Sequence, residues 1–179
     1  MLKLHLGSGI KRLKGFLNVD LDPNVNPDII ADLRDLPFDD SSVDEIYACA
    51  VIEHFGRHEQ KSVLSEWYRI LRPGSYLYLS TTDFEQCARH YLENKSISSI
   101  LGLVMGGQKS IYDHHGMIYD FCSLENLMLE AGFSNIKRYD WRSYDVGIQG
   151  LDDYSQAYIP HMDKETGRLM ALNVCAVKL

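Results

Sequence analysis

Short apolar runs recur near the start of the chain, and polar or glycine-rich turns separate them. Four runs have the length of strands, at residues 2–6, 16–19, 29–31 and 43–51. The last run is apolar almost throughout, which is typical of a strand buried on both faces of a parallel sheet. The pattern therefore predicts four short strands, each followed by a turn, in a largely parallel sheet.

A helical period replaces the strand pattern over residues 57–71. Apolar side chains recur there at the spacing that places them on one face of a helix. They are Val63, Leu64, Trp67, Ile70 and Leu71. Pro73 and Gly74 predict the end of this helix, and the alternating residues 76–80 predict the next strand.

The rest of the chain alternates helices and strands less regularly. We expect helices over 83–94, 96–105 and from Ser123 to just before Gly132, strands over 135–141 and 169–179, and a long loop over 143–167. Because a loop rather than a crossover helix joins the last two strands, we expect them to be antiparallel. The sequence thus predicts an α/β protein with a Rossmann-like, doubly wound, mostly parallel sheet and an antiparallel terminal strand.

The turn after the first strand carries the first candidate chemistry. Gly7-Ser8-Gly9 follows that strand at once, and the second strand ends at Asp20. Residues 10–15 are too few for a crossover helix, which needs about a dozen, so the first crossover helix is predicted to be truncated. Glycines let the backbone approach a ligand closely, and an acid at a strand end can accept hydrogen bonds from a ribose. The layout is typical of a nucleoside site at the carboxyl edge of a sheet, and a tight turn without a ligand is the alternative.

Composition narrows the classes of partner. The 179 residues suit one domain over 1–179, and the net charge of −7 argues against nucleic acid, whose phosphates need a basic surface. No apolar stretch approaches the roughly 20 residues of a membrane span, and the chain begins directly with a strand, so we expect neither a membrane partner nor a signal peptide. Four scattered cysteines without a CxxC pair are expected to be buried, reduced thiols of a cytoplasmic protein. They are Cys49, Cys87, Cys122 and Cys175.

Four stretches of the chain resemble class I S-adenosylmethionine-dependent methyltransferases, in the order that this family shows. They are LHLGSG, NVD, IIADLRDLPFDDSSVDEIYACAVIEHF and LSEWYRILRPGSYLYLS. The third and fourth are the specific ones, and the resemblance spans nearly the whole chain. Farther on, His115 and the segment MIYDFCSLENLMLEAGF resemble a subgroup often found with polysaccharide and lipopolysaccharide biosynthesis genes.

This resemblance implies S-adenosylmethionine as the cofactor. The residues that it implies in cofactor binding are Gly7, Ser8, Gly9, Asp20, Leu21, Asp32, Leu33 and Glu53. The glycines would pass under the amino acid end, Asp20 would accept hydrogen bonds from the ribose, and Asp32 would accept one from the adenine amino group. A turn cap is the alternative reading of each acid.

Methyl transfer is a displacement at an activated carbon, and the protein mainly holds the two reactants in line. A general base helps when the acceptor is a hydroxyl. The candidates are His54, His114 and His115, with a structural or cofactor-shaping role as the alternative for His54. No metal is predicted, because Asp113, His114 and His115 are adjacent in sequence without a spaced partner. Five tyrosines are candidates to line a sugar-sized pocket. They are Tyr112, Tyr119, Tyr144, Tyr154 and Tyr158.

The chain departs from the family pattern at its first motif. His5 stands where an acid is usual, and Lys11 replaces a third glycine. With no helix N-terminus at the carboxylate end of the cofactor, Lys11 or Arg12 is the candidate to compensate.

We therefore expect an enzyme that methylates a small molecule or glycan precursor at oxygen. Residues 1–82 would form its cofactor half, with 83–121 and 143–167 on the acceptor side. So small an acceptor side leaves either an open site or one completed in a homodimer. Two alternatives stay open: a protein that binds S-adenosylmethionine without catalysis, and an enzyme that cleaves S-adenosylmethionine itself.

Overall fold

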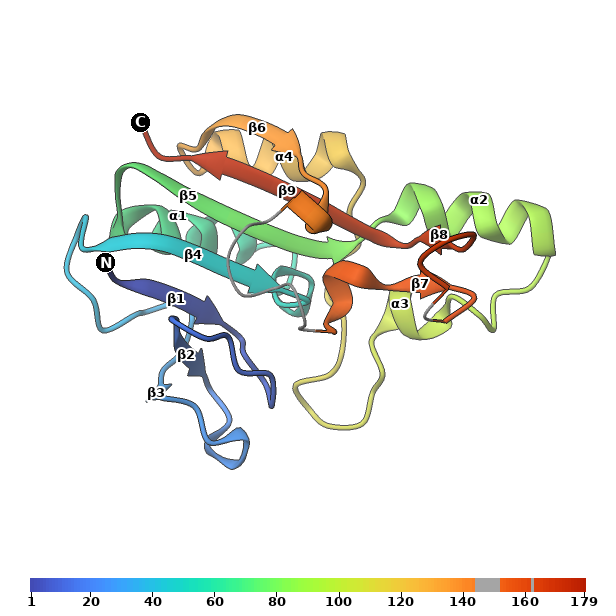
Figure 1. Ribbon diagram of the computed structural model, residues 1–179, viewed down its shortest axis with the longest axis horizontal. Helices are drawn as coiled ribbons and strands as arrows, with labels where there is room; N and C mark the ends of the chain where they lie inside the picture. Colours follow the sequence, from blue (N-terminus) through green and yellow to red (C-terminus); the bar gives the residue numbers. More distant parts are fainter. Residues whose placement is uncertain (144–151, 162) are drawn as a thin grey trace.

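A seven-stranded, mostly parallel sheet forms the centre of the computed structural model (Figure 1), which describes residues 1–143, 152–161 and 163–179. The strand order is β3-β2-β1-β4-β5-β9-β6. The strands are β1 Lys3–Leu6, β2 Leu17–Asp20, β3 Ile29–Ile30, β4 Val43–Cys49, β5 Leu71–Thr82, β6 Ser134–Arg138 and β9 Ala171–Val177. Neighbours from β3 through β5 are parallel, whereas β9 is antiparallel to β5 and to β6. The predicted fold class is confirmed, including the antiparallel terminal strand.

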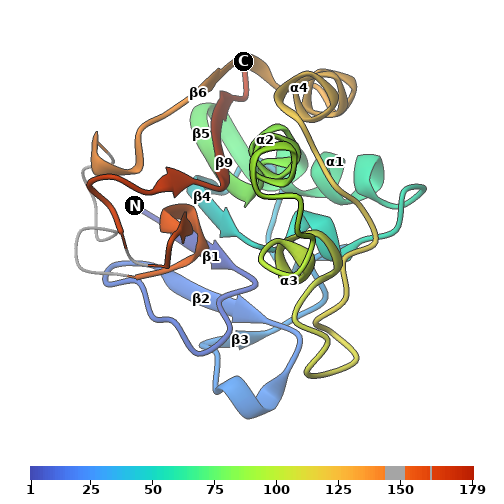
Figure 2. The ribbon, with the colours of Figure 1, turned by 90° about the vertical axis from the view of Figure 1, so that its right-hand side faces the viewer.

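Helices α1 (Gln60–Ile70) and α4 (Phe121–Glu130) lie on one face of this sheet (Figure 2). The apolar stripe of α1 is buried in the main core, and Trp67 at its centre is 0% exposed. The indole Nε1–H of Trp67 donates to the backbone carbonyl of Leu33 at 3.0 Å. Helix α1 therefore anchors the loop after β3, which contains Leu33.

On the opposite face of the sheet, turns and a small apolar cluster pack near β1 in place of a crossover helix. Residues 7–16 form turns instead of a helix, as their number predicted. A small cluster of Leu13, Phe16, Tyr47 and Cys49 packs on this face. The 3-10 turn η4 (Tyr154–Gln156) also joins it, because the Asn173 amide on β9 donates to the Ser155 carbonyl at 2.9 Å. The truncated crossover thus leaves room for a distant segment near β1.

Elements from two segments of the chain, one before α4 and one after β6, lie at the carboxyl ends of the parallel strands. This region contains α2 (Phe84–Asn94), α3 (Leu101–Met105) and the two-stranded sheet of β7 (Tyr158–Ile159) and β8 (Arg168–Leu169). These elements approach the end of the sheet where the ligand site is expected. None of the helices described is long and apolar enough to cross a lipid bilayer.

Several predicted boundaries shift for local reasons. Strand β5 already begins at Leu71, so Pro73 and Gly74 lie inside it, and the Gly74 N–H donates to the Lys178 carbonyl. Helix α4 begins two residues before Ser123, because Asp120 is its N-cap and Ser123 completes the capping box.

Helix α3 is shorter than predicted: it begins at Leu101, not residue 96. The cysteine prediction holds for Cys49, Cys87 and Cys175 but is wrong for Cys122, which is exposed on the outer face of α4.

Candidate functional site

Three cavities meet at the carboxyl ends of β1, β4 and β5, and Ala50 lines all of them. We name each by one residue. The Asp20 cavity, about 400 Å³, is lined by Asp20, Asp32, Leu33, Phe55 and Tyr112 among others. The Glu53 cavity, about 100 Å³, is lined by Glu53, His54, Thr81, Thr82 and His115 among others. The Lys11 cavity, about 790 Å³, is lined by His5, Ser8, Lys11, Tyr154 and His161 among others.

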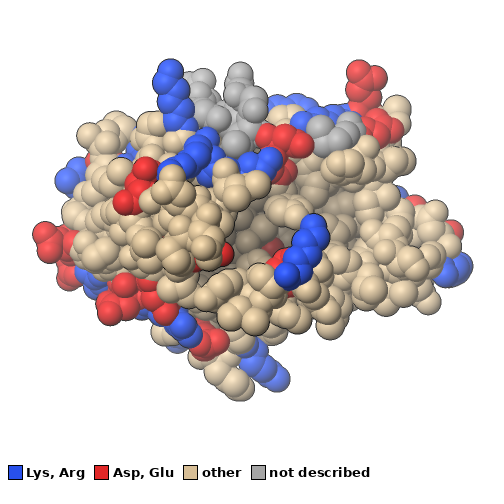
Figure 3. All heavy atoms as spheres, turned by 90° about the horizontal axis from the view of Figure 1, so that it is seen from below, with Lys and Arg blue, Asp and Glu red and all other residues tan. Residues whose placement is uncertain are grey.

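Ala50 has a left-handed backbone, with φ +55°. Such a conformation is unfavourable for a residue with a Cβ and concentrates at functional sites. The surface on this side of the molecule is hollowed near its centre, with side chains of both charges around the hollow (Figure 3). The junction of the three cavities is therefore the candidate active site.

The glycine turn and Asp20 form one unit at the edge of the Asp20 cavity. The Asp20 carboxylate accepts from the Gly9 N–H at 2.7 Å and from the Asp22 N–H at 3.0 Å, one bond to each oxygen. Gly7 has φ +61°, and a Cβ there would lie 2.4 Å from Cγ2 of Val51. Only glycine fits this position. Each Asp20 oxygen has a second acceptor site for a hydroxyl group, so the residues fit the ribose end of the predicted cofactor.

Asp32 lies in the same cavity but has a protein partner. Its carboxylate accepts from Nε and Nη2 of Arg34, at 3.0–3.1 and 2.7 Å, and Arg34 also pairs with Glu59 at 2.9 Å. These bonds lower the pKa of Asp32, with the Arg34 side chain as the main cause, so the group stays ionised. A carboxylate can accept further hydrogen bonds, which leaves the proposed adenine contact compatible with this pair. The sequence did not predict Arg34 here.

Residues distant in sequence complete the Asp20 cavity. Ile111, Tyr112 and His114 line it from the loop that follows α3. His114 was predicted as a candidate base, but the structure places it on this side, and its carbonyl accepts from Nδ1–H of His54 at 3.0 Å. Nothing local in the sequence indicated Ile111 for this cavity.

The Glu53 cavity is lined by three other predicted residues, Glu53, His54 and His115. Glu53 belongs to the turn η2 (Ile52–His54), and its backbone carbonyl accepts from the N–H groups of Gly116 and Met117 at 2.7 and 3.1 Å. This places His115 beside His54, with ring centroids 5.0 Å apart and ring planes at 81°. The family resemblance assigned Glu53 to the cofactor; in the structure Glu53 lines the Glu53 cavity and not the Asp20 cavity.

Two buried polar atoms of this cavity have no hydrogen-bond partner among the described residues. They are Oε2 of Glu53 and Nδ1 of His115. Burial raises the pKa of Glu53 and lowers the pKa of His115. The His115 ring is therefore neutral near neutral pH. Buried polar groups without partners are rare in proteins, so these two atoms are candidates to meet a ligand.

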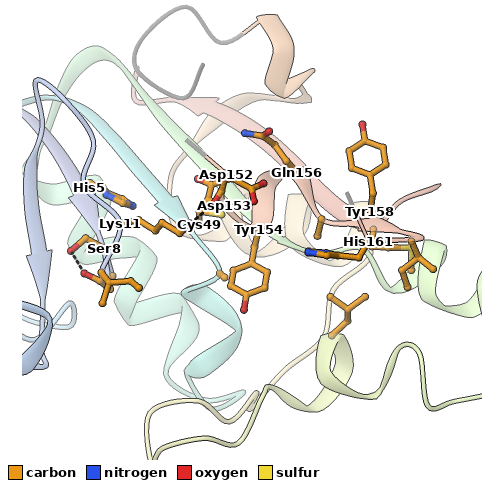
Figure 4. A pocket seen from close by; sticks show the side chains of 18 of the residues that line it. His5, Ser8, Lys11, Cys49, Asp152, Asp153, Tyr154, Gln156, Tyr158 and His161 are labelled. Atoms are coloured by element: carbon orange, nitrogen blue, oxygen red, sulfur yellow. Dashed lines mark hydrogen bonds between the residues drawn. The ribbon is translucent and has the colours of Figure 1, made fainter. Parts of the chain in front are cut away.

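The Lys11 cavity is the largest of the three (Figure 4), and Lys11 lies opposite His161 in that view. Nζ of Lys11 donates to the carbonyl of Asp152 at the rim. Arg12 instead pairs with Asp28 at 3.2 Å and does not line the cavity. Of the two predicted substitutes for the missing helix N-terminus, Lys11 lines one of the three cavities and Arg12 lines none of them.

His5 forms part of the same cavity wall and is 3% exposed. Its Nδ1 lies 3.1 Å from Oδ1 of Asn18, which also accepts from the Leu13 N–H. The Asn18 amide nitrogen donates to Asp28 at 2.8 Å, which fixes its oxygen toward His5. Nδ1 of His5 is therefore the donor, and its Nε2 is an acceptor in the neutral ring. Burial lowers the pKa of His5.

The predicted tyrosines are dispersed. Tyr112 lines the Asp20 cavity, Tyr154 and Tyr158 line the Lys11 cavity, and Tyr119 is buried in the core. Tyr144 lies outside the described residues. Within the described part of the chain, no group of three potential metal ligands is present.

Comparisons with known proteins agree with this geometry. Residues 11–79 match the model of a family described as a methyltransferase domain. No curated protein matches the chain in sequence.

Solved structures share the fold over nearly the whole chain. A S-adenosylmethionine-dependent methyltransferase from Thermotoga maritima, described as a possible histamine N-methyltransferase, has a TM-score of 0.63 and 19% identity, covering 99% of this chain and 82% of its own. A Haloferax volcanii protein solved with the Trm112 methyltransferase activator has a TM-score of 0.59 and 18% identity, covering 98% of this chain and 81% of its own.

A third structure was solved with a cofactor product. It is phosphoethanolamine N-methyltransferase 2 from Haemonchus contortus with S-adenosylhomocysteine, with a TM-score of 0.51 and 15% identity, covering 76% of this chain and 34% of its own. At these identities the likeness shows the fold, and the domain match adds the activity. The predicted enzyme class, a S-adenosylmethionine-dependent methyltransferase, and its cofactor are confirmed.

Proposed function

We propose that this enzyme methylates an oxygen of a small-molecule or glycan-precursor acceptor, as the resemblance to the polysaccharide-associated subgroup implies. The observation that carries this proposal is the unpartnered, buried Nδ1 of His115 in the Glu53 cavity, next to the junction at Ala50. A neutral imidazole nitrogen there is suited to accept the proton of a hydroxyl group. The cofactor, when bound, supplies the activated methyl group.

The cofactor half, residues 1–82, binds S-adenosylmethionine and orients it. Gly7, Ser8 and Gly9 support the amino acid end, and Asp20 with Leu21 binds the ribose. Asp32 and the backbone of Leu33 bind the adenine. The cavity geometry supports these roles, since Gly7, Asp20, Leu21, Asp32 and Leu33 all line the Asp20 cavity.

His115 and His54 have two different roles in this proposal. His115 acts as the base, and His54 holds the segment after α3 through its bond to the His114 carbonyl. A neutral His115 is ready to accept a proton because burial lowers its pKa. Replacing a positioned base typically costs about 10²–10⁴-fold in rate.

The acceptor side takes in residues 83–121 and 143–167, of which 144–151 and 162 lie outside the described residues. The Lys11 cavity of about 790 Å³ has room for an acceptor of sugar size. We further propose that the chain works as one domain in the cytoplasm on such a small acceptor, without nucleic acid or membrane. A homodimer would complete the open rim of this cavity.

Calorimetry with S-adenosylmethionine and S-adenosylhomocysteine tests the cofactor site. Asp20→Ala should weaken both ligands about 10–100-fold, since a hydrogen bond to a charged group contributes about 1.5–3 kcal/mol. Asp22→Ala is the matched control, because Asp22 caps the turn η1 (Pro23–Val25) and lines none of the three cavities. If neither ligand binds the wild type, the proposed function is wrong.

Turnover then separates the alternatives. Formation of S-adenosylhomocysteine with a panel of sugar hydroxyl acceptors, lost in His115→Gln, is the expected result. Methylthioadenosine or homoserine lactone as the product would instead show cleavage of the cofactor. Binding without any turnover across the panel would favour a non-catalytic protein.

A further inference from the structure

The side chain of Glu53 is an unusual feature of the Glu53 cavity. It is 2% exposed, and its Oε2 has no partner in the described part of the chain. A hydrogen bond with the Thr81 side chain reaches the carboxyl group, and burial raises its pKa. A buried carboxylate oxygen without a partner is unfavourable. A ligand that brings a donor to this oxygen would remove that penalty.

The other carboxyl group of the cavity differs from Glu53. Asp113 accepts from the Gly107 N–H at 3.1 Å through Oδ1 and from the Lys109 N–H at 3.2 Å through Oδ2. Its two oxygens therefore stabilise their own loop. Glu53 has no such task for Oε2, which leaves this atom available to a ligand.

The lining of the cavity selects the sign of the ligand's charge. Two carboxyl groups, Glu53 and Asp113, line it, and the described lining residues include neither Lys nor Arg. A carboxylate or phosphate group would be repelled there, whereas a cationic donor would be attracted. The volume of about 100 Å³ suits a small head group such as an ammonium with its attached carbon.

The Glu53 cavity lies next to the place where we propose that methyl transfer occurs. It meets the Asp20 and Lys11 cavities at Ala50, and His115 lines it together with Glu53. We infer that Glu53 binds a protonated amine of the acceptor, beside the hydroxyl group that His115 deprotonates. The acceptor is then an amino alcohol such as an amino sugar. This inference rests on the proposed function and assigns Glu53 to the acceptor instead of the cofactor.

Two cofactor analogues test the inference without knowledge of the acceptor. S-Adenosylhomocysteine has no group at the transferred methyl position, whereas sinefungin carries a protonated primary amine there. Both share the ribose, the adenine and the amino acid end. Calorimetry gives the ratio of their affinities for wild type, Glu53→Gln and the control Glu130→Gln, and thermal unfolding checks that each variant folds. Glu130 is an exposed residue of α4 that lines none of the three cavities.

We expect the preference for sinefungin over S-adenosylhomocysteine to fall at least tenfold in Glu53→Gln and to stay within twofold in Glu130→Gln. S-Adenosylhomocysteine itself should bind Glu53→Gln within threefold of wild type. If Glu53→Gln does not fold, Glu53→Asp, which withdraws the carboxyl group from the cavity, takes its place.

Two results would overturn the inference while leaving the proposed function intact. One is an unchanged preference in a folded Glu53 variant. The other is an equal loss of both analogues, which would place Glu53 in cofactor binding. Failure of wild type to bind S-adenosylhomocysteine is a separate result, and it contradicts the proposed function itself.

Discussion

Replacing Trp67 by phenylalanine tests how the main core supports the cofactor edge. The phenyl ring keeps most of the apolar contact of the indole but removes the Nε1–H that donates to the Leu33 carbonyl at 3.0 Å. Both residues are buried, at 0% and 6% exposure. An acceptor left without its partner costs about 1–3 kcal/mol, and a methyl-sized void costs about 1 kcal/mol more.

The predicted loss for Trp67→Phe is therefore about 2–4 kcal/mol of unfolding free energy. For a chain of this length, about 2–4 °C in Tm corresponds to each kcal/mol, so Tm should fall by about 4–16 °C. Circular dichroism during heating measures this change. The matched control is Trp141→Phe, since Trp141 is only half-buried and its Nε1–H lies 3.3 Å from the Tyr158 hydroxyl. A decrease below about 2 °C, or an equal decrease in both variants, would refute the reasoning.

Two further predictions concern the glycine turn and its neighbours. Burial lowers the pKa of His5 below its ordinary value of 6.5. The neutral ring therefore contributes its full stability above pH 6.5, and this contribution is lost as the pH falls from 6.5 toward the folded-state pKa. The Tm of His5→Gln should depend less steeply on pH over about pH 5–7 than that of wild type, and equal slopes would contradict this assignment. Gly7→Ala should lower Tm more than Gly15→Ala, because both have positive φ but only the Cβ at Gly7 meets Val51, at 2.4 Å. Thermal unfolding measures the difference, and similar losses in the two variants would show that Val51 moves aside freely.

The fold was predictable because its signals are local. A continuous apolar run identified β4, and the helical spacing of apolar residues identified α1. The short link after Gly9 ruled out a full crossover helix by length alone. The start of β5 was not predictable, since Pro73 and Gly74 usually end elements. Here β4 pairs with Leu71 before a register shift, and the carbonyl of Lys178 partners the Gly74 N–H.

Some residues of the candidate site were likewise predictable from local signals, and others were not. The glycine turn, Asp20 and Asp32 were predictable from the sequence, because the carboxyl ends of parallel strands share one edge of the sheet. The tertiary structure brings His115 to Glu53, about sixty positions away along the chain, through a backbone hydrogen bond from the N–H of Gly116 to the Glu53 carbonyl. It also decided the direction of the Glu53 side chain, because a 3-10 turn after a strand has no alternation from which to read it. Periodicity predicts which face a residue takes within an element, whereas contacts between distant segments decide what that residue meets.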